Sequence, residues 1–181
     1  MAVLIVIDIQ KEYITPGRDF YLKGIEPSLA NANKVLAFAR QQQWHIVHVQ
    51  HVRKDPQSSV WNRSSGFCDF VPGFEPLANE THILKHQFSC YSAPEFVKYI
   101  EEYKNEALYM IGYNTRMCCL STAVEGYHRG HIYHVISDAT LAKATEQFSE
   151  TDMHGHMLAV TDGVFAKVIN TATVLEKHAT K

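Results

Sequence analysis

The hydrophobic positions of this 181-residue chain fall into short apolar runs separated by longer segments of mixed character. Residues 2–7 (AVLIVI) are all apolar and rich in β-branched side chains, which predicts a strand buried on both faces. Residues 45–51 (HIVHVQH) largely alternate between polar and apolar, which is typical of a strand. The remaining predicted strands cover residues 81–84, 107–112, 132–136 and 164–168.

Helical patterns lie between these strands. Ser92 is a suitable N-cap with Glu95 three residues later, and Gly130 is a suitable helix end. Residues 9–26 and 52–80 are rich in residues that favour turns, so both are predicted to be loops. The predicted helices cover residues 27–42, 92–103, 118–129, 147–160 and the C-terminal segment.

This alternation predicts one α/β domain over residues 1–181, with a doubly wound, mostly parallel six-stranded sheet between two helical layers. Binding sites of such sheets lie beyond the carboxyl ends of the strands. Asp8, Lys85 and Cys118 each fall at or shortly after a predicted strand end. We therefore expect these three side chains to converge, although they are distant in sequence.

Composition narrows the partners that this chain can have. A net charge of −2 and a pI near 6.6 argue against nucleic acid and anionic membranes, so a small-molecule substrate is expected. The apolar first strand is too short for a signal peptide, and no run reaches the roughly 18 apolar residues of a membrane helix. The four cysteines (68, 90, 118 and 119) contain no C-x-x-C, which favours free thiols in the cytoplasm.

Cys118 is the candidate nucleophile because it lies where a predicted strand turns into a helix. There the helix dipole favours a thiolate, and free N–H groups can stabilise an oxyanion. Asp8 would accept the thiol proton and return it to a leaving amine, while Lys85 would keep the thiolate ionised. Each residue also has an ordinary structural interpretation: a buried core cysteine, a capping aspartate and a surface lysine.

Four short motifs occur in order along the chain. Asp8-Ile-Gln10 ends the first strand, and Lys85 is followed by Ser89-Cys90-Tyr91. The other two motifs are Gly112-x-x-Thr115-x-x-Cys118-x-x-x-Thr122-Ala123 and Ser137-Asp138-Ala139. Together they resemble the isochorismatase-like cysteine hydrolases, which include nicotinamidases, N-carbamoylsarcosine amidase, ureidoacrylate amidohydrolases and biuret hydrolases. The resemblance covers nearly the whole chain.

The resemblance implies that Cys118 is the nucleophile, Asp8 the general base and acid, and Lys85 a supporting cation. It also implies a cis peptide bond before Asn114 and an oxyanion hole formed by the backbone N–H groups of Asn114 and Cys118. The implied reaction cleaves an amide, ureide or carbamoyl C–N bond through a thioester. Relatives commonly form dimers or tetramers, so a homo-oligomer is expected.

Two departures from the family pattern are mild, namely Cys90 for alanine and Tyr91 for phenylalanine. Cys119 follows the nucleophile where valine is common, and it is interpreted as a core residue rather than a redox group.

Histidines near the second strand do not predict a metal site. Alternation places His45 and His51 on one face and His48 on the other, and the Asp-x-His metal motif of nicotinamidases is missing. We therefore expect no metal and no cofactor, and histidines that belong to the core or its rim. The missing motif also argues against nicotinamide as the substrate.

Loops after the strands are expected to line the pocket, although each side chain here has a packing or surface role as its alternative. Arg53 would suit a substrate carboxylate. Two other functions remain open: an isochorismatase-type vinyl-ether hydrolase, and a catalytically silent binding or assembly protein. The candidate pocket residues are Tyr13, Phe20, Arg53, Trp61, Phe67 and Tyr113.

Overall fold

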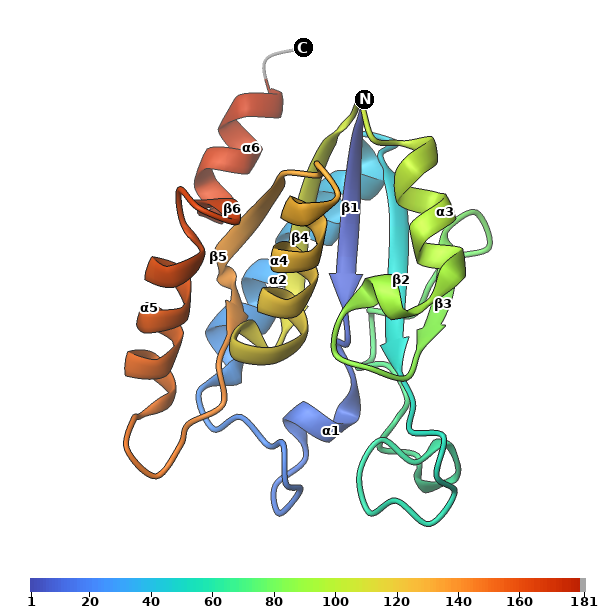
Figure 1. Cartoon of the computed structure of the whole chain (residues 1–181), viewed down its shortest axis with the longest axis vertical. Helices are drawn as coiled ribbons and strands as arrows, with labels where there is room; N and C mark the ends of the chain where they lie inside the picture. The colour runs from blue at the N-terminus through green and yellow to red at the C-terminus, as the bar shows by residue number, and fades with distance from the viewer. Residues whose placement is uncertain (180–181) are drawn as a thin grey trace.

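The computed structural model describes residues 1–179, and a six-stranded parallel sheet forms its centre (Figure 1). The strand order is β3-β2-β1-β4-β5-β6, and each neighbouring pair is parallel. The predicted α/β class is confirmed. The strands are β1 (Ala2–Ile7), β2 (His45–His51), β3 (Thr81–Lys85), β4 (Ala107–Tyr113), β5 (Tyr133–Leu141) and β6 (Ala166–Ile169).

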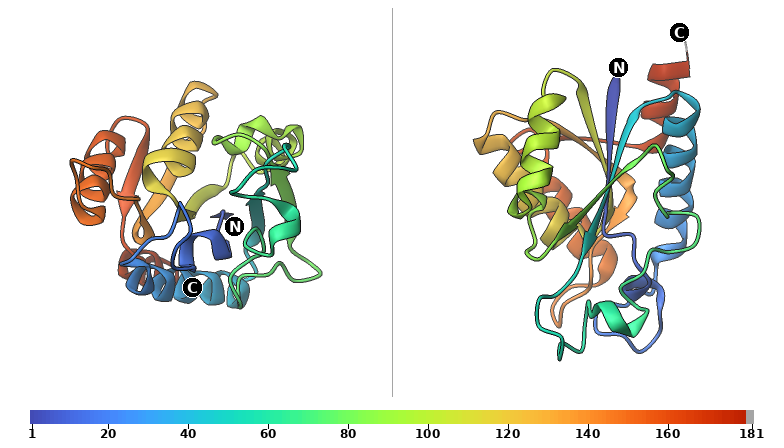
Figure 2. Two further views of the ribbon diagram at one scale, coloured as in Figure 1. Left: turned by 90° about the horizontal axis from the view of Figure 1, so that it is seen from below. Right: turned by 90° about the vertical axis from the view of Figure 1, so that its right-hand side faces the viewer.

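Helices cover both faces of the sheet. In Figure 2, α2 and α6 lie on one face, and α3, α4 and α5 lie on the other. Short 3₁₀ turns occur at Arg63–Ser65 and Cys90–Ser92, and a π-helical turn occurs at Thr115–Cys119. The α-helices are α1 (Lys11–Ile14), α2 (Ile25–Gln41), α3 (Pro94–Glu102), α4 (Leu120–His128), α5 (Glu150–Thr161) and α6 (Thr171–Ala179).

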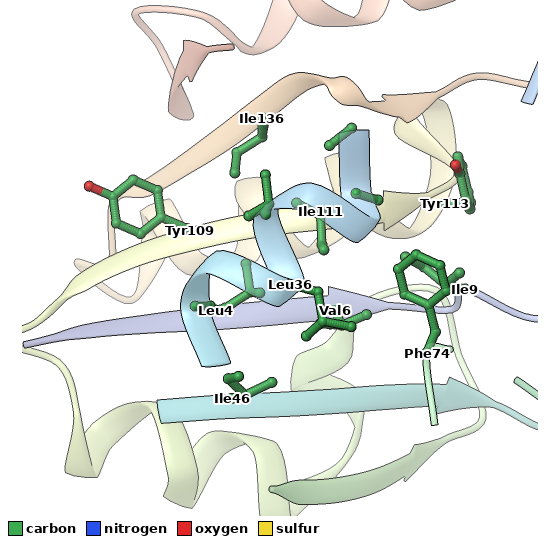
Figure 3. Packing of buried hydrophobic residues seen from close by; sticks show 14 of the residues in the cluster. Leu4, Val6, Ile9, Leu36, Ile46, Phe74, Tyr109, Ile111, Tyr113 and Ile136 are labelled. Carbon is green, nitrogen blue, oxygen red and sulfur yellow. The ribbon is translucent and has the colours of Figure 1, made fainter. Parts of the chain in front are cut away.

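Strand β1 separates two hydrophobic clusters, which explains why its sequence is apolar without interruption. Leu4 and Val6 point to the side of α2, where they lie near Leu36 (Figure 3). Val3 and Ile5 belong to the opposite cluster, with residues of α3 and α4. Each fully buried aliphatic side chain of this kind contributes about 1.5–3 kcal/mol by leaving water. The strand that carries Asp8 is therefore held rigidly at the centre of the sheet.

Three details differ from the sequence predictions. Helix α3 begins at Pro94 with Ala93 as its N-cap, so Ser92 is not the cap; proline suits the first helical turn because its missing N–H is not needed there. The predicted loop 9–26 contains the short helix α1. Strand β5 continues to Leu141, because its pairing with β4 resumes after an irregularity between Met110 and Gly112.

The carboxyl ends of the strands share one edge of the sheet. Helix α1 and the long connection between β2 and β3 lie at this edge, at the bottom of Figure 1. Within residues 1–179, none of the helices combines the length and the apolar character needed to cross a membrane.

Gly112 is a position where the fold tolerates no side chain. Its φ is 117°, and a Cβ atom there would lie 1.9 Å from the backbone oxygen of Ile7. We expect Gly112→Ala to lower the free energy of unfolding by about 3 kcal/mol or more, because the β1–β4 pairing must separate. Urea unfolding followed by circular dichroism measures this loss.

Gly155 provides the matched control for this substitution. It is an exposed glycine inside α5, and an added Cβ would meet no atom within 4 Å. Gly155→Ala should stabilise the protein by about 0.5–1 kcal/mol, because alanine loses less backbone entropy in a helix. Equal stability of the two variants would contradict the packing described here.

Candidate active site

Asp8, Lys85 and Cys118 converge at the carboxyl edge of the sheet. The Lys85 Nζ atom lies 2.7 Å from Asp8 Oδ2 and 3.3 Å from Cys118 Sγ. Asp8 and Lys85 are fully buried, and Cys118 is 4% exposed. The structure thus brings together the three side chains that the sequence singled out.

The backbone fixes each of these side chains. Asp8 has a left-handed φ of 50°, a conformation that aspartate adopts more readily than most residues, and its N–H donates to Val49 O at 2.9 Å. Lys85 is the last residue of β3. The Lys85 ammonium also donates to the backbone oxygen of Gln87 at 3.1 Å, so its position is set from several sides.

The turn that carries Cys118 begins with a cis peptide bond between Tyr113 and Asn114, as the family resemblance implies. The Asn114 side chain accepts a hydrogen bond from Arg116 N at 3.1 Å, and its carbonyl accepts from Met117 N and Cys119 N. At the other end of the turn, Thr122 Oγ1 donates to the Cys118 carbonyl at 2.7 Å. These bonds hold the thiol at the start of α4.

The electrostatics of the site favour a protonated thiol while no substrate is present. Burial raises the pKa of Cys118 well above its usual value, the Asp8 carboxylate raises it further, and Lys85 lowers it by less. Burial also raises the pKa of Asp8, which the Lys85 ammonium opposes. Burial and the Asp8 carboxylate thus act in the same direction on the Cys118 pKa, and the Lys85 ammonium acts against both. The role of Lys85 as a support for the Cys118 thiolate stays a prediction; its ammonium lowers the Cys118 pKa, which is the direction that this role requires.

His51 is a fourth buried residue of the site that the sequence analysis did not select. It is the last residue of β2 and is 3% exposed, and its Nδ1 lies 3.0 Å from Lys85 Nζ. Burial, followed by the nearby Lys85 charge, lowers the His51 pKa to about 3. Alternation along β2 indicated its face of the sheet, but nothing local indicated that this face ends beside Lys85.

Asp8, His51 and Cys118 offer a carboxylate, an imidazole and a thiol within 4.8 Å of one another, a donor set that divalent metals accept. The Lys85 ammonium, however, is in direct contact with all three groups. A metal ion would have to displace this buried cation, so the group is better described as an ion-pair site. The other two histidines of β2 lie elsewhere: His48 pairs with Glu80 at 2.8 Å, and His45 stacks on Tyr103.

Aromatic side chains from the two long loops lie next to the site. Trp61 is 4% exposed, and its ring centroid lies 5.4 Å from that of His51 and 4.9 Å from that of Tyr13. Phe20 packs on Trp61 at 5.2 Å. Burial raises the pKa of Tyr13, and electrostatic interactions with Cys118 and Asp8 raise it further, which indicates that its hydroxyl is near them. Tyr13, Phe20 and Trp61 thus form one aromatic group.

Of the other predicted pocket residues, Tyr113 lies next to this group, because its ring centroid is 5.5 Å from that of Tyr13. Tyr113 is fully buried in the hydrophobic cluster beside α2 (Figure 3), and its hydroxyl shares a 2.9 Å hydrogen bond with Ser28. Phe67 lies under the Arg18 guanidinium at 4.4 Å. Arg53 is exposed, and its backbone N–H donates to Trp61 O at 3.0 Å.

The isochorismatase domain model matches residues 2–173, so the chain belongs to the isochorismatase family. Among curated proteins, the chain is 24% identical over 175 residues to the isochorismatase family protein YrdC of Bacillus subtilis, covering 93% of this chain and 91% of YrdC. It is 25% identical over 144 residues to the maleamate amidohydrolase of Pseudomonas putida, covering 70% and 66% of the two chains.

Solved structures agree with this assignment. An isochorismatase from Pseudomonas putida is 27% identical with a TM-score of 0.82, covering 95% of this chain and 89% of that one. A cysteine hydrolase from Pseudomonas syringae pv. phaseolicola has a TM-score of 0.86 at 20% identity, covering 97% and 91%. The second similarity supports the fold alone. The protein is therefore an isochorismatase-family hydrolase with the corresponding α/β fold.

The effect of the Asp8 carboxylate on the Cys118 pKa can be tested by substitution. Asp8→Asn removes the carboxylate that raises the Cys118 pKa, so the thiol should ionise at lower pH beside Lys85. We expect iodoacetamide to alkylate Cys118 at least about tenfold faster at pH 7 in this variant, since one pKa unit changes the thiolate fraction by that factor. Mass mapping identifies which cysteine reacts.

Glu12→Gln is the control, since Glu12 is also a fully buried carboxylate but pairs with Arg18 instead. Its Cys118 alkylation profile should match that of the unmodified protein. Slower alkylation in Asp8→Asn would show that the carboxylate does not act on the thiol as described.

Proposed function

We propose that this protein hydrolyses the C–N bond of a small amide, ureide or carbamoyl compound, with Cys118 as nucleophile. The observation that carries the proposal is the position of the Lys85 ammonium, in contact with both the Asp8 carboxylate and the Cys118 thiol in a buried site. A thiol beside a carboxylate, at a turn into a helix, is the arrangement that covalent acyl transfer requires.

In the proposed reaction, Asp8 removes the thiol proton as Cys118 Sγ attacks the substrate carbonyl carbon. The resulting tetrahedral oxyanion would be stabilised by the backbone N–H groups of Asn114 and Cys118. Asp8 then returns the proton to the departing nitrogen, which leaves as ammonia or an amine, and a thioester remains. Asp8 next accepts a proton from a water molecule as its oxygen attacks the thioester. The C–S bond breaks, the acid leaves, and Asp8 returns the proton to Cys118 Sγ to restore the thiol.

Similarity to the maleamate amidohydrolase supports C–N cleavage, although the shared identity is only 25%. Two alternatives differ in their need for the thiol. A vinyl-ether hydrolase of the isochorismatase type needs no cysteine nucleophile, and a silent binding protein needs no proton acceptor. The joint burial of Asp8, Lys85 and Cys118 favours the amidohydrolase, because burying these ionisable groups is costly without a use for them.

Removing the sulfur tests this proposal. Cys118→Ala should reduce turnover by more than about a thousandfold, because no nucleophile remains. The fold should persist, since Lys85 keeps its contacts with Asp8, His51 and Gln87. Ammonia release over a panel of small amides, maleamate, ureides and carbamoyl compounds identifies a substrate, and steady-state kinetics measures the loss.

Cys119→Ala is the matched control. Cys119 is a buried neighbour with its thiol 3.6 Å from Gly112 O, so its loss should cost stability but leave kcat within about threefold. If Cys118→Ala keeps more than about a tenth of the activity, the covalent mechanism is wrong.

A further inference from the structure

His51 is a buried titratable group that the proposed reaction does not use. Its backbone is held tightly: Gln10 Nε2 donates to His51 O at 3.0 Å, and His51 N donates to Gln10 Oε1 at 2.9 Å. The imidazole ring lies near the rings of Trp61 and Phe88, with centroids 5.4 and 6.4 Å away. The backbone and the ring of His51 thus both have neighbours that fix their position next to Lys85.

The contact with Lys85 determines which nitrogen of the His51 ring carries the proton. An ammonium group can only donate hydrogen bonds, so His51 Nδ1 must accept the one at 3.0 Å. A neutral imidazole then carries its proton on Nε2, and the neutral form agrees with the lowered pKa of about 3. The ring therefore presents an Nε2–H donor beside the catalytic groups.

That donor has no acceptor among the residues that the structure describes. His51 Nε2 is buried and makes no hydrogen bond there. A buried donor without an acceptor is destabilising, and a bound acceptor would remove that cost. His51 Nδ1 contacts the Lys85 ammonium, and the same ammonium contacts Cys118 Sγ. Nε2 belongs to the same small ring as Nδ1, so it also lies close to the thiol. A substrate that reaches the thiol therefore also comes close to Nε2.

We propose that His51 Nε2–H binds an oxygen of the substrate, and that the natural substrate is an amide with a second oxygen acceptor near the scissile carbonyl. This inference rests on the proposed function, which gives the first oxygen to the N–H groups of Asn114 and Cys118. Both a carboxylate and a ketone offer the required acceptor. Phe88, whose ring centroid lies 6.4 Å from that of His51, is 43% exposed, so this neighbour of the imidazole reaches the protein surface.

Matched substrates test the need for a second oxygen. Succinamate and butyramide differ in a carboxylate, and 4-oxopentanamide and pentanamide differ in a ketone oxygen. We expect kcat/KM to be at least about tenfold higher for one or both oxygen-bearing amides, since losing one such bond costs about that factor. The pair with the larger ratio identifies which oxygen source the site prefers. Equal rates within both pairs would overturn the substrate class.

Two substitutions separate substrate binding from an effect through Lys85. The shorter side-chain amide that His51→Asn introduces can replace the Nδ1 acceptor but not the distal donor, whereas His51→Gln can place a donor near the former Nε2. If His51 binds substrate, His51→Asn loses the preference for the oxygen-bearing amide and His51→Gln keeps most of it. If instead His51→Asn keeps the preference and His51→Gln loses it, His51 acts by positioning Lys85, and the proposal is overturned.

Binding without turnover keeps this test independent of the covalent mechanism. In the Cys118→Ala background, calorimetry compares succinamate and 4-oxopentanamide with and without His51→Asn. We expect at least about tenfold weaker binding of the preferred amide when His51 is replaced. Unchanged affinity, or no binding of either amide, contradicts the role of His51. Activity that survives Cys118→Ala contradicts the nucleophile instead, so the two failures are distinguishable.

Discussion

The buried ammonium of Lys85 is the constraint on which the site depends. A fully buried cation is stable only when it is paired and hydrogen-bonded, and here its partners come from different strand ends. Asp8 follows β1, His51 ends β2, and Cys118 follows β4. Each strand must keep its register for these groups to meet, because a slip of one residue would turn the side chain to the other face. The strand register that forms the hydrophobic core therefore also sets the geometry of the site.

Charge balance explains why this arrangement suits proton transfer. One ammonium faces one carboxylate and one thiol, so moving the proton from Cys118 to Asp8 leaves the net charge of the site unchanged. In a buried environment such a transfer avoids the large cost of creating an isolated charge.

The surroundings of the site come mainly from loops, while its chemistry comes from the sheet. Trp61, Tyr13 and Phe20 pack together beside His51, and the fully buried Glu12 pairs with Arg18, which also donates to Ser59 O. These contacts join the loop after β1 to the loop after β2. An isochorismatase of 27% identity shares the fold, and loops of this kind generally vary more among relatives than the sheet that carries them.

Sequence alone determined the alternation of strands and helices and the residues at the strand ends. The reason is that the spacing of hydrophobic positions and the apolar runs are local properties of the chain. It also selected Asp8, Lys85 and Cys118, and through the family resemblance the cis bond before Asn114. Only the tertiary structure decided that His51 joins them, that Tyr113 packs in the core, and that burial and the Asp8 carboxylate raise the pKa of Cys118. Burial and contacts between distant segments set those outcomes, and neither is encoded in the spacing of residues along one element.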